Sequence, residues 1–122
     1  MKGRILVVDD SGLARRGTRR VLEGAGYAVA EAEDGIAALE RYFVEKPDLV
    51  VLDLVMKGMY GLEVLSKLRE LDPAARVIVL SADIQTSSRQ MVNEAGAAAF
   101  LNKPVAADDL LAAISGALGT GA

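Results

Sequence analysis

Three short apolar runs constrain the fold of this chain more than any other feature. They cover residues Ile5–Val8, Leu49–Leu52 and Val77–Leu80 and consist entirely of Val, Leu and Ile. Continuous apolar runs of this length are typical of strands that are buried on both faces of a parallel sheet. Each run ends at a polar side chain, so each strand would leave the core at a residue that can carry chemistry.

Segments with helical periodicity lie between these runs. Weaker strands are expected at Tyr27–Ala32, near a sheet edge, and at Ala97–Leu101, where the alternation of elements outweighs the local helix preference of alanine. We expect helices after Ser11, after Asp34, around Val64–Leu71, over Asp83–Asn93 and from Asp108 to Leu118. Five strands that alternate with five helices predict an α/β sandwich with a parallel sheet, formed as a single domain over residues 1–122.

Composition excludes several classes of function. The chain has no Cys and no His, which removes disulfides, thiolate zinc sites, cysteine nucleophiles and imidazole bases. A metal would have to be bound by oxygen, so it would be magnesium or calcium, or there would be none. The net charge of -3, with charges of mixed sign, argues against general affinity for nucleic acid or anionic membrane. No run approaches the roughly 20 apolar residues of a membrane span, and no leader is recognisable, so a cytoplasmic location is expected.

Polar side chains follow the strongest strands at their carboxyl ends. Asp53 ends one strand, and alone it would be read as a cap or turn residue. The other residues at such positions are Asp9, Asp10, Ser81 and Lys103. Because ligands of open α/β sheets bind at the carboxyl ends of the strands, these groups should converge. Three carboxylates so placed require either a raised pKa or added cations; Lys103 supplies one charge and a bound Mg²⁺ would supply two.

The first predicted helix carries four arginines on much of its outer face, namely Arg15, Arg16, Arg19 and Arg20. A solvated helix surface is the simpler interpretation of this face. A docking patch for an acidic partner is the alternative.

The motifs in order resemble those of response-regulator receiver domains, the phosphoacceptor modules of two-component signalling typified by the single-domain chemotaxis regulator. The motifs span essentially the whole chain and are Val7–Asp10, Glu33–Gly35, Pro47–Asp53, Gly58–Gly61, Ser81–Ala82, Gly96–Ala97 and Lys103–Pro104. The resemblance implies a doubly wound, flavodoxin-like sheet with strand order 2-1-3-4-5. The sequence departs from the family pattern at Lys57, where the family usually has Pro, and at Tyr60, where the family often has Asp.

The resemblance also implies a role for each site residue. Asp53 would be the phosphoacceptor, and Mg²⁺ would be bound by Asp10 directly, by Asp9 largely through water, by Asp53 and by the backbone carbonyl of Val55. Lys103 would pair with the phosphoryl group. Ser81 and Phe100 would be the switch residues, and the peptide bond before Pro104 would be cis.

By the same resemblance, a phosphohistidine on a sensor histidine kinase or a phosphotransfer protein would be the donor. Phosphorylation would change the surface of the last two helices and the last strand, and a downstream protein would read it. The chain would act as a monomer or weak dimer. Three alternatives are an interaction module without phosphotransfer, a receiver fragment of a larger regulator or hybrid kinase, and a small enzyme or nucleotide binder. The last is disfavoured because no GxxxxGK[ST] loop is present.

Overall fold

The computed structural model describes residues 3–54, 61–82 and 86–119 and contains five strands and five helices in strict alternation. The strands are β1 (Arg4–Val8), β2 (Ala28–Ala32), β3 (Leu49–Asp53), β4 (Val77–Ser81) and β5 (Ala99–Asn102). The helices are α1 (Gly12–Gly24), α2 (Gly35–Glu45), α3 (Gly61–Leu71), α4 (Thr86–Glu94) and α5 (Ala107–Leu118). The predicted α/β architecture is confirmed.

All five strands are parallel and lie in the order β2-β1-β3-β4-β5. The three strongly apolar runs form the three central strands, which are almost completely buried, whereas β2 and β5 are the partly exposed edges. This is the doubly wound order that the family resemblance implied, and it is confirmed.

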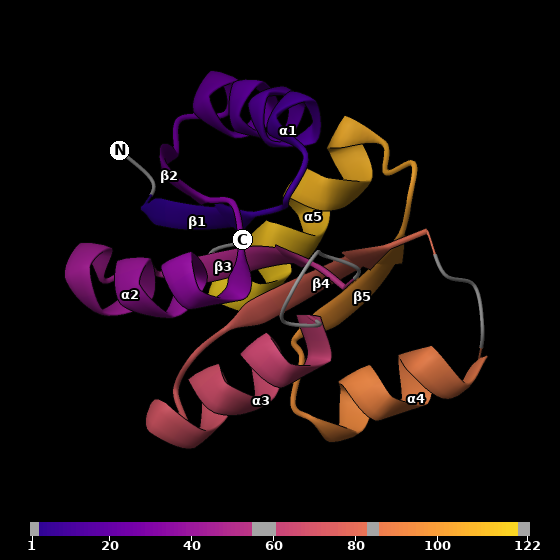
Figure 1. The fold of residues 1–122 in the computed structure, drawn as a ribbon. Helices are drawn as coiled ribbons and strands as arrows, with labels where there is room; N and C mark the ends of the chain where they lie inside the picture. Colours follow the sequence, from indigo (N-terminus) through magenta and orange to yellow (C-terminus); the bar gives the residue numbers. More distant parts are fainter. Residues whose placement is uncertain (1–2, 55–60, 83–85, 120–122) are drawn as a thin grey trace.

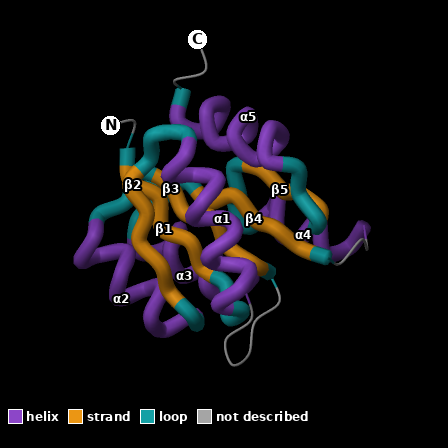
Figure 2. The backbone as a smooth tube through the Cα atoms, turned by 90° about the horizontal axis from the view of Figure 1, so that it is seen from above, coloured by secondary structure: helices purple, strands orange, loops and turns teal. Residues whose placement is uncertain are grey.

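Helices cover both faces of the sheet, as Figure 1 and the view from above in Figure 2 show. On one face, Leu22 of α1 and Ile114 of α5 pack against alternate residues of the central strands, such as Ile5 and Val51. On the other face, α2, α3 and α4 pack against the intervening residues, such as Leu6 and Val50. Because successive side chains of a strand point to opposite faces, a central strand can serve both layers only if it is apolar throughout.

Two helix starts and the turn after α1 follow from local chemistry. The side chains of Ser11 and Asp34 accept hydrogen bonds from the backbone N–H groups of Ala14 and Ala37 and so cap α1 and α2. After α1, Gly26 has a φ of +98°, a conformation that glycine adopts without steric cost. Ser11 therefore caps α1 as expected from the sequence, and Asp34, expected only to turn the chain, caps α2 as well.

The last strand begins later than predicted. We expected it over Ala97–Leu101, but β5 spans Ala99–Asn102. The N–H of Ala97 still donates to the carbonyl of Val92 and belongs to the turn that ends α4, and pairing with β4 starts with the bond from Ala98 to Val77. The alanines are therefore divided between a helix terminus and a strand.

Helix α4 starts at Thr86, and the predicted first residues of this helix, Asp83 to Gln85, lie outside the described residues. The described helices are all too short or too polar to span a bilayer.

Candidate functional site

The polar residues at the strand ends do converge on one edge of the sheet. Strands β1 and β3 are central neighbours, with Val8 opposite Leu52, so Asp9 and Asp53 continue from adjacent strands. On the other side, Asp53 is in register with Leu80, and Ser81 with Asn102, which brings the residues after β4 and β5 to the same edge. Parallel strands place all their carboxyl ends together, and this is why residues from four separate segments meet here.

Lys103 joins two of the acids. Its ammonium donates a hydrogen bond to Oδ2 of Asp9 at 3.0 Å and lies 3.4 Å from Oδ2 of Asp53. The backbone positions this side chain, because the N–H of Lys103 donates to the carbonyl of Ser81 at 2.8 Å. The Lys103–Pro104 peptide bond is cis, as the resemblance implied. The side chain of Lys103 therefore reaches from the end of β5 to the ends of β1 and β3.

The pKa of Lys103 lies above its ordinary value. Burial favours the neutral amine, but the hydrogen bond to Asp9 and the negative charges of Asp53 and Asp9 outweigh it. Lys103 is therefore a cation at neutral pH. It is largely enclosed, with 29% of its side chain exposed, so its interaction with the acids is screened less than that of a surface ion pair.

The two acids that Lys103 contacts belong to a cluster of three carboxylates. One oxygen from each of Asp9, Asp10 and Asp53 lies within 4.8 Å of the other two. Asp9 is buried and oriented by its neighbours, since its Oδ1 accepts the N–H of Ser11 at 2.9 Å while its Oδ2 accepts Lys103. The three acids and Lys103 together carry a formal charge of about -2, which a divalent cation would balance.

The donor set fits Mg²⁺. This ion binds carboxylate oxygens at about 2.0–2.1 Å, so opposite ligands are about 4 Å apart, and it retains several waters. Oxygens within 4.8 Å of one another can bind such an ion directly or through water. The predicted backbone ligand, the carbonyl of Val55, lies outside the described residues, as do Lys57 and Tyr60.

Comparison with known proteins agrees with this arrangement. Residues 5–115 match the family model of the response regulator receiver domain. The chain belongs to the response regulator receiver domain family.

Individual relatives resemble this receiver domain over nearly its whole length. It is 40% identical to the chemotaxis protein CheY of Bacillus subtilis, with 94% of this chain and 97% of that protein covered. It is 43% identical to the response regulator MprA of Mycobacterium ulcerans over 92% of this chain, which spans only about half (48%) of MprA. The crystal structure of a CheY-like receiver domain protein from Methanospirillum hungatei superposes with a TM-score of 0.91, at 31% identity, covering 97% of this chain and 94% of that one. Receiver domains function in two-component signalling and generally bind Mg²⁺ at acidic residues, and this chain has the acidic cluster.

The two predicted switch residues occupy different environments in this receiver domain. Ser81 ends β4 and is fully buried beside the acidic edge. Phe100 is half-buried in β5, and the guanidinium carbon of Arg89 from α4 lies 5.1 Å from the centre of its ring. Arg89 also donates a hydrogen bond to Oδ1 of Asn102 at 2.6 Å. Arg89 therefore links α4 to the strand that leads to Lys103.

Two of the arginines in α1 are part of the site's surroundings, which the sequence did not indicate. Arg15 and Arg19 both pair with Glu31 of β2, at 3.0 and 2.7 Å, so these two side chains are not fully solvated. Arg16 and Arg20 are exposed, as predicted. This pairing could have been anticipated from Glu31, an acid inside a predicted strand, which needs a cationic partner. Arg15 and Arg19 are four residues apart and therefore share the helix face that could provide it.

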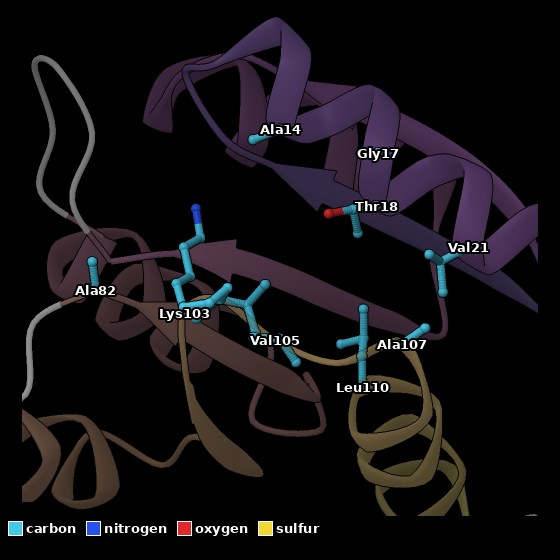
Figure 3. A pocket seen from close by; sticks show the side chains of 11 residues that line it. Ala14, Gly17, Thr18, Val21, Ala82, Lys103, Val105, Ala107 and Leu110 are labelled. Carbon is cyan, nitrogen blue, oxygen red and sulfur yellow. The ribbon is translucent and has the colours of Figure 1, made fainter.

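An apolar groove of about 480 Å³ leads away from Lys103 between α1 and α5. Figure 3 shows Ala14, Thr18 and Val21 of α1 on one side and Val105, Ala107 and Leu110 on the other. Lys103 extends into the space at one end. Ala14, Thr18 and Val21 are only half-buried, so this face of α1 stays partly accessible along the groove.

Proposed function

We propose that this receiver domain accepts a phosphoryl group on Asp53 from a phosphohistidine of a sensor histidine kinase or a phosphotransfer protein. The observation that carries the proposal is the convergence of Asp53 with Asp9, Asp10 and Lys103 at one sheet edge. Each side chain has a separate part in the reaction. We include in the proposal the organisation of residues 1–122 as one receiver domain, in line with a match that covers 94% of this chain and 97% of CheY. The proposal also includes a cytoplasmic location.

The reaction is a phosphoryl transfer from nitrogen to oxygen. An oxygen of the Asp53 carboxylate attacks phosphorus in line and forms a P–O bond, while the P–N bond of the donor breaks and its electron pair stays on the imidazole. Mg²⁺, when bound, would offset negative charge on the phosphoryl oxygens. Asp10, Asp9 and Asp53 would hold it, with the backbone carbonyl of Val55 in the role that the resemblance implies. The imidazole must come from the donor because this chain has no His.

Lys103 has a second part in this mechanism. Its ammonium lies 3.4 Å from Oδ2 of Asp53, so it stands where oxygens of an aspartyl phosphate would come within its reach. A phosphoryl group adds about -1.5 to -2 charges and strong acceptors. Lys103 can move from the carboxylate to the phosphoryl group without a large rearrangement. Ser81, on the neighbouring strand end, would supply a hydroxyl donor to the same group.

Signalling follows from movement of these two residues. Ser81 ends β4 and Lys103 follows β5, so drawing both toward a phosphoryl group would alter the segments that lead into α4 and α5. We propose that this shifts an existing equilibrium of the α4–β5–α5 surface, with Phe100 changing its position, and that a downstream protein binds the shifted form. Regulation through protein contacts requires neither nucleic-acid binding nor membrane insertion by this domain. We propose that the domain acts as a monomer or a weak dimer.

The groove between α1 and α5 is the docking surface that we propose for the phosphodonor. It is lined mostly by apolar side chains and ends at Lys103. A donor that covers the groove would carry its phosphohistidine to the acidic edge. Replacing Thr18 with Arg should then slow phosphorylation by the protein donor and leave phosphorylation by a small phosphodonor unchanged.

The central test is labelling by a small phosphodonor such as acetyl phosphate, followed by mass spectrometry. The wild-type domain should be labelled only when Mg²⁺ is present, and Asp53→Ala should not be labelled. Asp109→Ala, which removes an exposed acid from the first turn of α5, is the matched control and should be labelled normally. Full labelling of Asp53→Ala would move the acceptor to another residue, and no labelling of the wild type would favour an interaction module without phosphotransfer.

A further inference from the structure

We propose that Arg15 is a positioning residue for the acidic cluster, because its guanidinium holds the peptide group between Asp9 and Asp10 in the orientation in which the two carboxylates converge. The inference rests on the proposed function, in which this cluster binds Mg²⁺. Arg15 itself would contact neither the metal nor the phosphoryl group.

The contact that carries this inference is made to the backbone. Nη1 of Arg15 donates a hydrogen bond to the carbonyl oxygen of Asp9 at 2.6 Å. That carbonyl belongs to the planar peptide unit that joins Asp9 to Asp10, and rotation of this unit would redirect the side chains on both sides of it. A hydrogen bond from a charged donor is stronger than one between neutral groups, so the guanidinium is suited to fix the plane.

Arg15 is itself fixed on its other edge. Its Nε donates to Oε1 of Glu31 at 3.0 Å, and Arg19 donates to Oε2 of the same carboxylate at 2.7 Å. The side chains of Arg15 and Glu31 are only 17% and 24% exposed. The hydrogen bond from Arg19, together with that from Arg15, holds the pKa of Glu31 below its ordinary value despite partial burial, so Glu31 is charged at neutral pH. The strand-end acids are thus tied through Arg15 to both α1 and β2.

Position and charge have opposite effects on metal binding here. A cation near the cluster repels Mg²⁺, so if Arg15 acted only through its charge, removing it would strengthen Mg²⁺ binding. If Arg15 holds the acids in place, removing it weakens binding. Glu31 offsets the charge of Arg15 at close range, which reduces the repulsion between Arg15 and Mg²⁺. The positioning effect should therefore dominate. The sign of the change in affinity therefore separates the two roles.

The experiment compares Arg15→Gln with Arg16→Gln in the full chain. Both variants lose one positive charge from the same turn of α1, but Arg16 is exposed and, within the described ranges, donates no hydrogen bond to the peptide units of the acids. Mg²⁺ affinity is measured by calorimetry at neutral pH, and the free energy of unfolding by urea. Arg15→Gln should bind Mg²⁺ about tenfold more weakly, the lower end of the effect of removing a group that orients metal ligands. Arg16→Gln should bind as the wild type or slightly more tightly, and Arg15→Lys should recover part of the loss.

A second measurement needs no metal. The N–H of Ser11 donates to Oδ1 of Asp9, so hydrogen exchange at Ser11 reports the position of that carboxylate. Exchange at Ser11 should be faster in Arg15→Gln and unchanged in Arg16→Gln. Unchanged or tighter Mg²⁺ binding by Arg15→Gln, an equal loss in Arg16→Gln, or unchanged exchange at Ser11 would each overturn the positioning role. A wild-type chain that binds no Mg²⁺ would instead refute the proposed function, and exchange at Ser11 would still decide whether Arg15 orients Asp9.

Discussion

The ammonium of Lys103 lies 3.4 Å from a carboxylate oxygen of Asp53, and the same ammonium bonds to Asp9 at 3.0 Å. The cation is therefore already among the acids before any phosphoryl group arrives. It lowers the repulsion between carboxylates that lie within 4.8 Å of one another, a repulsion of about 4 kcal/mol for two charges at 4 Å in a medium of dielectric constant 20. The arrangement is prepared for the reaction that we propose, since Lys103 needs only a short movement to meet incoming negative charge.

Replacing Lys103 with Gln should change Mg²⁺ binding and phosphorylation in opposite directions. Loss of the ammonium leaves the three acids without a neighbouring cation, so Mg²⁺ should bind more tightly, by up to about tenfold. Labelling of Asp53 by acetyl phosphate should be slower by at least about tenfold, because the phosphoryl oxygens lose a charged donor. Calorimetry and time-resolved mass spectrometry measure the two effects. A variant that is labelled at the wild-type rate would show that Lys103 does not assist the transfer.

Gly61→Ala should destabilise the domain by about 2–3 kcal/mol. A Cβ atom at Gly61 would lie 2.6 Å from the carbonyl oxygen of Asp53 and 2.7 Å from Cα of Leu54, and backbone atoms cannot move aside as a flexible side chain can. The strand end that carries Asp53 would shift, so labelling should also slow. Urea unfolding measures the first effect.

Gly17→Ala is the matched control for Gly61→Ala. Gly17 is inside α1, and no atom of a neighbouring described segment lies within 4 Å of the place where a Cβ atom would be, so alanine there should stabilise the chain by about 0.5–1 kcal/mol through helix propensity. Equal effects of the two substitutions would rule out the proposed close contact at Gly61.

Tyr42 should make stability depend on pH above pH 10. Burial, with the 2.7 Å hydrogen bond to Asp72, raises the pKa of Tyr42 from 10.0 to about 12. The folded state therefore holds this proton more tightly than the unfolded state does. The resulting stability is fully present below pH 10 and is lost as the pH rises to about 12, a decrease of the order of 2 kcal/mol.

The comparison with Tyr42→Phe isolates this contribution, because the lysines titrate in both proteins. Subtracting the free energies of unfolding at each pH should leave a difference that is nearly constant below pH 10 and shrinks above it. The variant should be about 2 kcal/mol less stable at neutral pH, because it loses one hydrogen bond from α2 to the charged carboxylate of Asp72, the residue after α3. A difference that stays constant up to pH 12 would show that the hydroxyl titrates normally in the folded state.

Arg89 should couple energetically to Phe100. The guanidinium carbon lies 5.1 Å from the ring centre at a largely exposed site, where a cation–π contact contributes about 0.5–1 kcal/mol. A double-mutant cycle of Arg89→Ala and Phe100→Leu should yield an interaction energy in that range from urea unfolding. If Phe100 changes position on phosphorylation, a beryllofluoride phosphoryl mimic with Mg²⁺ should reduce this interaction energy. Persistence of the same value with the mimic would argue against a moving Phe100.

The sequence alone determined the elements and their chemistry. Continuous Val, Leu and Ile runs of this length are typical of strands buried on both faces, and such strands need helices on both sides of the sheet. Acids and a hydroxyl directly after those runs, and a lysine after the last strand, then indicate one reactive edge, because parallel strands end together. The strand order and the cis bond before Pro104 came from resemblance to a family and are confirmed by the structure.

Only the tertiary structure decided which side chains meet. The pairing of Lys103 with Asp9, the bond from Arg15 to the peptide of Asp9 and the late start of β5 at Ala99 appear in no local pattern. Residue periodicity reports which face of an element is buried, because burial acts on each side chain separately. A contact between distant segments depends on how helices and strands pack and on the direction of each side chain, and a single sequence does not specify these one residue at a time.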